Sequence, residues 1–270
     1  MFYRSEILAR NNINIVGQGE QTLLLAHGFG CDQRMWRFLV PLLREKYRLV
    51  LFDYTGSGQS ETSNYDAQKY STLEGYAQDI VDICETLELE NVNIVGHSVS
   101  GIIAAIAAQQ SPAGISNIIM VCPSPCFLNL PPDYMGGFDE QDLQELIGLM
   151  DQNYIGWANY FAPLVAGTAN SEVFTQELAS SFCSTNPVMA KNFAKATFFA
   201  DYRHLLPDIS QPTSIMQSNI DALASISIGQ YMHKHIPNST ISIIEAEGHC
   251  LHMTHPQQVV DNIEAFLVET

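Results

Sequence analysis

Short apolar runs alternate with longer amphipathic stretches along most of this chain. Continuous apolar runs predict strands that are buried on both faces, as in a parallel sheet. Buried strands of this kind are predicted at 22–26, 48–53 and 117–122, an alternating β-branched strand at 92–96, and further strands of the sheet at 213–217 and 240–244. Residues 7–16 alternate only weakly and predict an edge strand. Helices are predicted at 35–46, 73–87, 226–235 and 257–268, the last of them amphipathic, and a helix of small apolar residues is predicted at 102–108. This rhythm predicts an α/β fold, with a mostly parallel central sheet and helices on both faces.

The alternation stops after residue 122, and from about 139 to 201 only helical periodicity remains. The candidate helices are 140–152, 154–165, 172–182 and 187–200. Asp139 and Asn186 suit helix N-caps, and Pro187 suits a first helical position. Four helices inserted between two strands predict a lid over the carboxyl edge of the sheet. We therefore expect a core of 1–127 and 202–270 and a helical lid of 128–201.

Composition narrows the range of possible binding partners. The chain has 270 residues and a formal net charge of −17, which argues against nucleic acid and anionic membrane surfaces as partners. The six cysteines are scattered rather than arranged as a disulfide framework. Neither a signal peptide nor an apolar run of membrane-spanning length is visible, so we expect a cytoplasmic protein.

One strand-to-helix junction carries a candidate nucleophile. The strand at 92–96 runs into Gly96-His97-Ser98-Val99-Ser100, and a helix of small residues follows. This resembles the G-x-S-x-G nucleophile elbow, with serine in place of the second glycine. A tight turn there would hold the Ser98 hydroxyl above the end of the sheet. The alternative is a dinucleotide-type crossover in which Ser98 only caps a helix.

A nucleophilic serine needs a base, and the base needs an acid that orients it. On sheets of this kind the three residues follow in the order serine, acid, histidine. Ser98, Asp221 and His249 fit that order, and the last two directly follow predicted strands. Asp208 is the alternative acid, but it precedes its strand. The predicted oxyanion donors are the backbone N–H groups of Val99 and Phe29.

Two other chemistries receive little support. His249, His252 and His255 are spaced like metal ligands, but no carboxylate or thiolate set accompanies them on a helix. We therefore expect no metal, and packing or capping roles for His252 and His255. The glycines at 56 and 58 lack the third glycine of a dinucleotide fingerprint and the lysine of a P-loop, so we expect no cofactor.

Several segments together resemble the RsbQ branch of the α/β-hydrolases, whose plant relatives are the strigolactone and karrikin receptors. They are 27–33, 52–58, 96–100, 123–129, 153–158, 182–185 and 248–250. The resemblance implies an α/β-hydrolase fold, a Ser–His–Asp triad, a four-helix lid and a hydrophobic pocket. The pocket residues it implies are Phe127, Trp157, Phe161, Phe198, Ala222 and Leu223. Aromatic packing within the lid is the alternative role for Trp157 and Phe161.

Two functions remain open at this point. The first is a serine hydrolase that cleaves a small, largely apolar ester or lactone, butenolide-like, through an acyl-enzyme on Ser98. The second is a ligand-sensing signalling protein with slow hydrolysis, which activates a phosphatase-type partner in a stress response. Both share one site, and the sequence names neither the substrate nor the partner.

Overall fold

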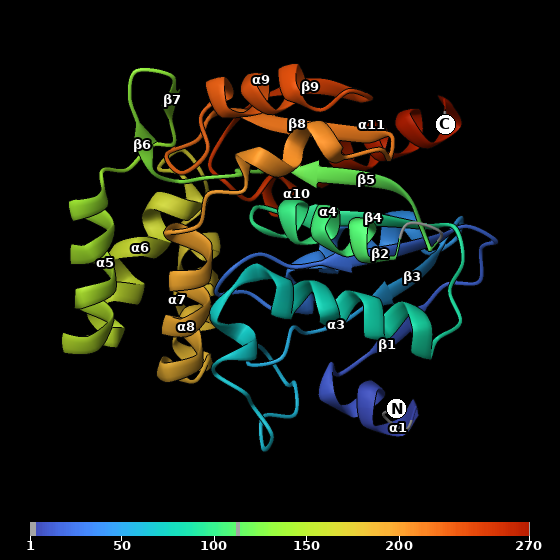
Figure 1. The fold of residues 1–270 in the computed structure, drawn as a ribbon, viewed down its shortest axis with the longest axis horizontal. Coiled ribbons are helices and arrows are strands. Elements are labelled where there is room, and N and C mark those ends of the chain that lie inside the picture. Colours follow the sequence, from blue (N-terminus) through green and yellow to red (C-terminus); the bar gives the residue numbers. More distant parts are fainter. Residues whose placement is uncertain (1–3, 112–113, 270) are drawn as a thin grey trace.

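The computed structural model describes residues 4–111 and 114–269. Its centre is a seven-stranded sheet in the order β1-β3-β2-β4-β5-β8-β9 (Figure 1). All neighbouring strands are parallel except β1 and β3, which are antiparallel. The strands are β1 (Asn14–Val16), β2 (Thr22–Ala26), β3 (Arg48–Leu51), β4 (Val92–His97), β5 (Ile115–Val121), β8 (Thr213–Ile220) and β9 (Ser239–Glu247). The predicted mostly parallel α/β fold is confirmed.

The central strands end level with one another. Every residue of β2 and β4 is buried, as expected of strands in the middle of a parallel sheet that is covered on both faces. Ala26 at the end of β2 pairs with Gly96 of β4, which in turn pairs with Met120 of β5. The segments that follow these strands therefore leave the sheet side by side at its carboxyl edge, where parallel sheets of this kind place their ligands.

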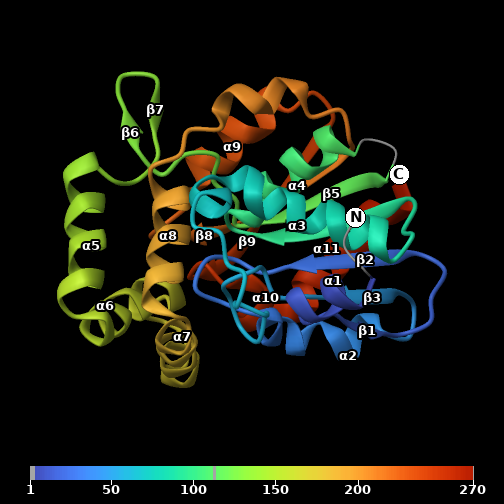
Figure 2. The same ribbon diagram turned by 60° about the horizontal axis from the view of Figure 1, so that its bottom comes forward.

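Helices cover both faces of the sheet. On one side lie α3 (Leu73–Thr86), α4 (Ser100–Gln110) and α9 (Ile226–His235), and on the other lie α2 (Val40–Leu43), α10 (Leu251–Thr254) and α11 (Pro256–Glu269) (Figure 2). The amphipathic α11 buries Val259, Val260 and Ile263 against the sheet side. Within the described ranges, no helix is long and apolar enough to cross a membrane. All six cysteines are free thiols.

Two predicted elements near the N-terminus are wrong. Instead of one edge strand over 7–16, Arg4–Arg10 forms helix α1 and only Asn14–Val16 forms a strand. In α1, Ile7 is the buried residue, and Arg10 pairs with Asp79 and Asp82 of α3, so tertiary contacts hold this helix. The predicted helix over 35–46 is divided into a 3-10 helix, Gln33–Phe38, and the short α2. Pro41 has no backbone N–H, so it cannot continue a helix from the preceding turn.

The inserted helices lie beyond the carboxyl ends of the strands, at the left of Figure 1. They are α5 (Glu140–Gln152), α6 (Tyr154–Ala166), α7 (Glu172–Ser184) and α8 (Pro187–Phe198), and each end lies within two residues of its prediction. Asp139 forms a capping box with Asp142, and the Asn186 side chain accepts hydrogen bonds from two N–H groups of α8. A short hairpin of β6 (Asn129–Leu130) and β7 (Tyr134–Met135), which the sequence did not predict, precedes α5.

Candidate active site

Ser98 lies at the turn between β4 and α4 in a backbone conformation that side chains rarely adopt, with φ of +57°. Gly96 is required here because a Cβ would come within 2.5 Å of the Ser100 carbonyl oxygen. Ser100 stands where the elbow pattern has a second glycine, and its hydroxyl donates a hydrogen bond to the carbonyl of His27. This bond ties the elbow to the end of the neighbouring strand β2.

The structure brings Ser98, His249 and Asp221 together from three different loops. His249 Nε2 lies 2.7 Å from Ser98 Oγ, and His249 Nδ1 lies 2.7 Å from Asp221 Oδ2. An ionised carboxylate only accepts hydrogen bonds, so Nδ1 carries the proton and Nε2 accepts the Ser98 O–H. All three groups are shielded from solvent, because Ser98 is 5% and His249 2% exposed and the Asp221 side chain is fully buried.

The loop that follows β8 fixes the carboxylate. Asp221 Oδ1 accepts backbone N–H groups from Leu223, at 2.8 Å, and from Ala224, at 3.1 Å. Its second oxygen is thereby left for His249. Asp208, the alternative acid, ends the 3-10 helix Arg203–Asp208, which precedes β8, and its side chain is exposed.

His252 and His255 do not reach Ser98. His255 Nδ1 lies 2.9 Å from the Thr254 hydroxyl. His252 is fully buried, with its ring 4.7 Å from the Trp36 ring centroid. Burial lowers the pKa of His252 to about 3, which keeps its imidazole neutral. Packing, the role that the sequence predicted, fits this environment.

Two groups of side chains in the described part of the chain are close enough to consider as metal ligands. One is His97, Cys250 and His252, and the other is Cys122, Asp221 and His249. Burial raises the pKa of both thiols, Cys122 and Cys250, whereas metal ligation needs the thiolate. In the second group, Asp221 and His249 already bond to each other. We assign no metal to either group.

A small enclosed cavity of about 20 Å³ adjoins Ser98 and His249. Its lining comprises Phe29, Cys31, His97, Ser98, Phe127, Phe161, Val165, Thr197, Phe198, Leu223 and His249. Of the pocket residues that the resemblance implied, Phe127, Phe161, Phe198 and Leu223 border it. Ala222 is exposed and does not line it, because the Asp221 turn directs the chain outward at that residue.

Trp157 is buried but lies one layer behind the cavity wall. Its indole stacks on Tyr154 and Phe161, with ring centroids 5.3 and 5.6 Å away, and meets Phe29 edge-on at 6.0 Å. Trp157 thus packs within the helices, as the alternative interpretation proposed, whereas Phe161 borders the cavity. The Phe29 ring also contacts Phe182 and Phe198, so α6, α7 and α8 all meet it.

The sequence analysis missed Cys31, Val165 and Thr197 as cavity residues. Val165 lies four positions after Phe161 on α6, and this helical spacing places both on one face. Thr197 directly precedes Phe198 on α8, and Cys31 directly follows the glycine-rich turn after β2. Of these three residues, only Val165 could have been found from the helical periodicity of the sequence.

Phe29 and Val99, the predicted oxyanion donors, both lie near Ser98 in the structure. Val99 follows Ser98 in the elbow, and Phe29 follows β2, the strand that pairs with β4. Val99 is 1% exposed and Phe29 is 9% exposed. Both backbone segments therefore reach the same edge of the sheet beside the serine.

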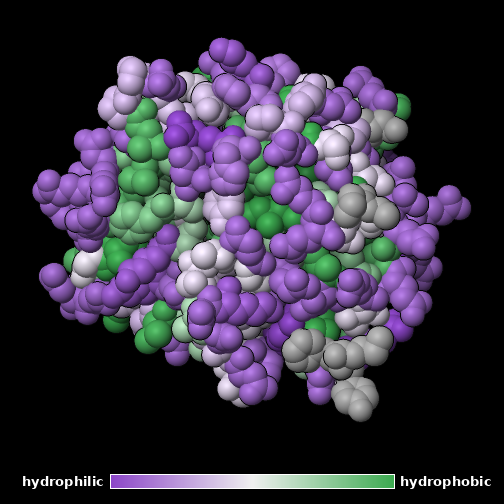
Figure 3. Space-filling model, viewed as in Figure 1, coloured by the Kyte–Doolittle hydropathy of each residue, from purple (hydrophilic) through white to green (hydrophobic). Residues whose placement is uncertain are grey.

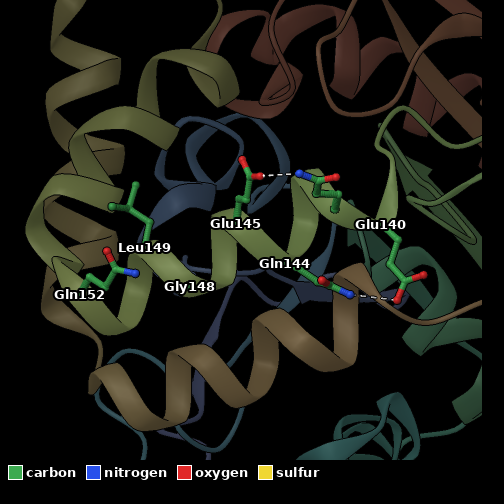
Figure 4. A pocket seen from close by; sticks show the side chains of 7 residues that line it. Glu140, Gln144, Glu145, Gly148, Leu149 and Gln152 are labelled. Atoms are coloured by element: carbon green, nitrogen blue, oxygen red, sulfur yellow. Dashed lines mark hydrogen bonds between the residues drawn. The ribbon is translucent and has the colours of Figure 1, made fainter.

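A larger hollow, of about 990 Å³, lies elsewhere (Figure 4). All of its lining residues come from α5, where Glu140 accepts a hydrogen bond from Gln144 and Glu145 one from Gln141. The lining contains no nucleophile, and none of its residues borders the Ser98 cavity. We assign it no function.

A serine on a strained strand-to-helix turn, joined to a histidine and a carboxylate at the carboxyl edge of a parallel sheet, defines the α/β-hydrolase class. A family model described as alpha/beta hydrolase fold matches residues 21–256. This chain belongs to that family.

The relatives agree with this assignment. The chain is 39% identical to a Karrikin insensitive 2 receptor of Petunia hybrida over 251 residues, which is 93% of each chain. It is 33% identical to a strigolactone esterase of Arabidopsis thaliana, over 94% of each chain. A solved hydrolase from Oleispira antarctica is 55% identical and superposes with a TM-score of 0.98, covering 100% of this chain and 98% of that one. The chain is thus an α/β-hydrolase related to plant receptor hydrolases, as the sequence predicted.

Proposed function

We propose that this protein is a serine hydrolase of small, largely apolar esters or lactones, including butenolide-like rings. The observation that carries the proposal is the position of His249, whose two ring nitrogens lie 2.7 Å from Ser98 Oγ and from Asp221 Oδ2. This arrangement supports removal of the serine proton by a neutral imidazole that a carboxylate orients. Names of relatives, such as strigolactone esterase, point to the same chemistry.

In the proposed reaction, Ser98 Oγ attacks the substrate carbonyl while its proton moves to His249 Nε2. The backbone N–H groups of Phe29 and Val99 stabilise the negative oxygen that forms. His249 then gives the proton to the leaving alkoxide, and an acyl-enzyme remains on Ser98. A water molecule, deprotonated by His249, attacks the acyl carbon and the bond to Ser98 Oγ breaks. His249 returns the proton to Ser98 Oγ, and the acid leaves. Every step uses side chains and backbone of this chain together with water.

The cavity favours small, apolar substrates. Six of the eleven residues that line it are apolar, among them Phe29, Phe127 and Phe161. Its volume of about 20 Å³ holds little more than one water molecule. Entry of a lactone therefore requires the wall to move. We propose that the segment 128–201 acts as a lid on a core of 1–127 and 202–270, because α6 and α8 supply the side of the wall opposite the elbow.

The test is hydrolysis of a small aryl ester and of a butenolide probe by the wild type and by Ser98→Ala. We expect the variant to lose roughly three orders of magnitude in kcat. Mass spectrometry should detect an acyl adduct of the wild type and none of the variant. Equal rates for the two proteins would refute the proposal.

A second function is favoured by the names of the curated relatives, several of which are receptors. In this version the protein senses a small ligand, hydrolyses it slowly and activates a phosphatase-type partner in a stress response. A butenolide adduct on Ser98 or His249 that persists over many minutes would favour sensing. Rapid turnover of many esters would favour a metabolic hydrolase. We also propose a cytoplasmic location, since free cysteines are typical of a reducing compartment.

A further inference from the structure

The hydroxyl of Thr197 is a buried polar group without a partner. Thr197 lies near the end of α8, borders the same cavity as Ser98 and His249, and is 3% exposed. Its Oγ1 makes no hydrogen bond. A threonine inside a helix ordinarily satisfies its hydroxyl with the carbonyl three or four residues earlier. That bond is missing here.

The other walls of the cavity offer little polar contact. Six of the residues that line it are apolar, namely Phe29, Phe127, Phe161, Val165, Phe198 and Leu223. The Ser98 hydroxyl is engaged by His249, and the proposed reaction uses both. His97 Nε2 donates a hydrogen bond to the backbone carbonyl of His249. His97 Nδ1 faces Gly28, and a Cβ at residue 28 would lie only 2.4 Å from this nitrogen. Among the hydroxyl groups that border the cavity, Thr197 Oγ1 alone is unpaired.

An unpaired buried hydroxyl destabilises the protein, and a ligand that supplies a partner recovers this free energy. A site with such a group also discriminates strongly, because a ligand that lacks the matching atom leaves the group unpaired. The cavity is therefore not simply a small apolar pocket. Besides the reacting groups and the ring nitrogen Nδ1 of His97, which is also unpaired, it holds the Thr197 hydroxyl on the α8 side.

We propose that Thr197 determines substrate choice by hydrogen-bonding a second oxygen of the substrate, separate from the scissile carbonyl. This inference rests on the proposed hydrolase function. The substrate class it specifies is short-chain esters or small lactones that carry an ether, keto or hydroxyl oxygen a few bonds from the reacting carbon. Plain alkyl esters of equal size are poorer substrates, since they leave Thr197 unpaired.

The test uses two matched pairs of para-nitrophenyl esters. Methoxyacetate is compared with butyrate, and β-methoxypropionate with pentanoate, so that an oxygen replaces a methylene at two distances from the carbonyl. The ratio of kcat/KM within a pair is measured for the wild type, for Thr197→Val and for Thr197→Ser. Comparing proteins cancels the intrinsic reactivity of each ester. Thr185→Val serves as the control, because Thr185 lies beyond the end of α7 and does not border the cavity.

We expect Thr197→Val to lower the ratio for at least one pair by about 10-fold. Thr197→Ser, which retains the hydroxyl, and Thr185→Val should keep the wild-type ratio. The inference is overturned if Thr197→Val changes both ratios by less than about twofold, or if Thr197→Ser changes them as much as valine does.

A binding measurement separates this inference from the proposed function. If the wild type hydrolyses none of the four esters, the hydrolase proposal fails, and Thr197 is tested with unreactive ketones. Methoxyacetone and methyl propyl ketone differ by the same oxygen-for-methylene exchange. Ligand-detected NMR should show that Thr197→Val weakens binding of methoxyacetone only. Equal effects on the two ketones would overturn the role of Thr197.

Discussion

His97 Nε2 donates a hydrogen bond to the backbone carbonyl of His249, at 2.9 Å. His97 directly precedes the elbow serine, so this bond joins the chain segment of the proposed nucleophile to that of the proposed base. Burial, followed by the neighbouring His252 and His249, lowers the pKa of His97 well below its usual value. The imidazole therefore stays neutral, with its proton on Nε2.

The first prediction concerns this bond. His97→Leu should lower kcat about 10-fold or more with little change in KM, because a displacement of about 1 Å between reacting groups costs up to 100-fold. His97→Gln, which can place an amide N–H near the same position, should retain more of the activity. Steady-state kinetics with an aryl ester measure both. Equal losses in the two variants would show that side-chain volume matters there and the hydrogen bond does not.

The second prediction separates the two candidate acids. Asp221→Asn should lower kcat by roughly 10⁴-fold, because an amide can no longer hold His249 in the tautomer that accepts the serine proton. Asp208→Asn is the matched control. Its side chain is exposed at the opposite end of β8, so activity should stay within about twofold of the wild type. A large loss in the control, or none in Asp221→Asn, would contradict the proposed acid.

The third prediction concerns the glycine at which α7 meets the turn after β2. Gly30 has φ of +72°, and a Cβ there would lie 2.4 Å from the Phe182 ring. Gly30→Ala should lower the free energy of unfolding by about 1–3 kcal/mol through backbone strain and displacement of that ring.

Gly148→Ala should have the opposite effect on stability. Gly148 lies inside α5, and no heavy atom lies within 4 Å of the added Cβ. Alanine there should raise the free energy of unfolding by about 0.5–1 kcal/mol. Urea unfolding at neutral pH measures both variants. A stabilising Gly30→Ala would mean that Phe182 does not pack on this turn.

The fourth prediction is a pH dependence of stability. Burial, followed by repulsion from His249 and Arg37, lowers the pKa of His252 from an unperturbed 6.5 to about 3. Between those values the unfolded chain binds a proton at this residue and the folded chain does not. Stability therefore falls as the pH drops from about 6.5 towards 3, by up to about 1.4 kcal/mol per pH unit from this group.

His252→Gln should flatten this dependence. The exposed His233 supplies the control, and His233→Gln should leave the slope unchanged. Urea unfolding at several values between pH 7 and pH 4 gives the slopes. If His252→Gln keeps the wild-type slope, His252 takes up a proton in the folded state without penalty.

The alternation of apolar runs and amphipathic stretches determined the class of fold. Strands such as 22–26 and 92–96 are rich in apolar residues and buried along their whole length, because both faces of a central parallel strand are covered. The helices inserted at 140–198 could also be predicted from the sequence, since local caps such as Asn186 followed by Pro187 mark their starts. The conformation of the weakly patterned residues 4–16 could not be predicted from the sequence, because contacts between Arg10 and α3 decide it.

The order of Ser98, Asp221 and His249 along the chain was enough to predict that these three side chains meet, because the loops after parallel strands share one edge of the sheet. Only the tertiary structure decided that the two ring nitrogens of His249 lie equally close to Ser98 and Asp221. It also decided that Thr197 borders the cavity, whereas Trp157 lies behind it and Ala222 faces outward. Periodicity specifies which face of a helix is buried. Which residue borders a cavity depends on how several helices pack against one another. No local pattern in the sequence specifies that packing.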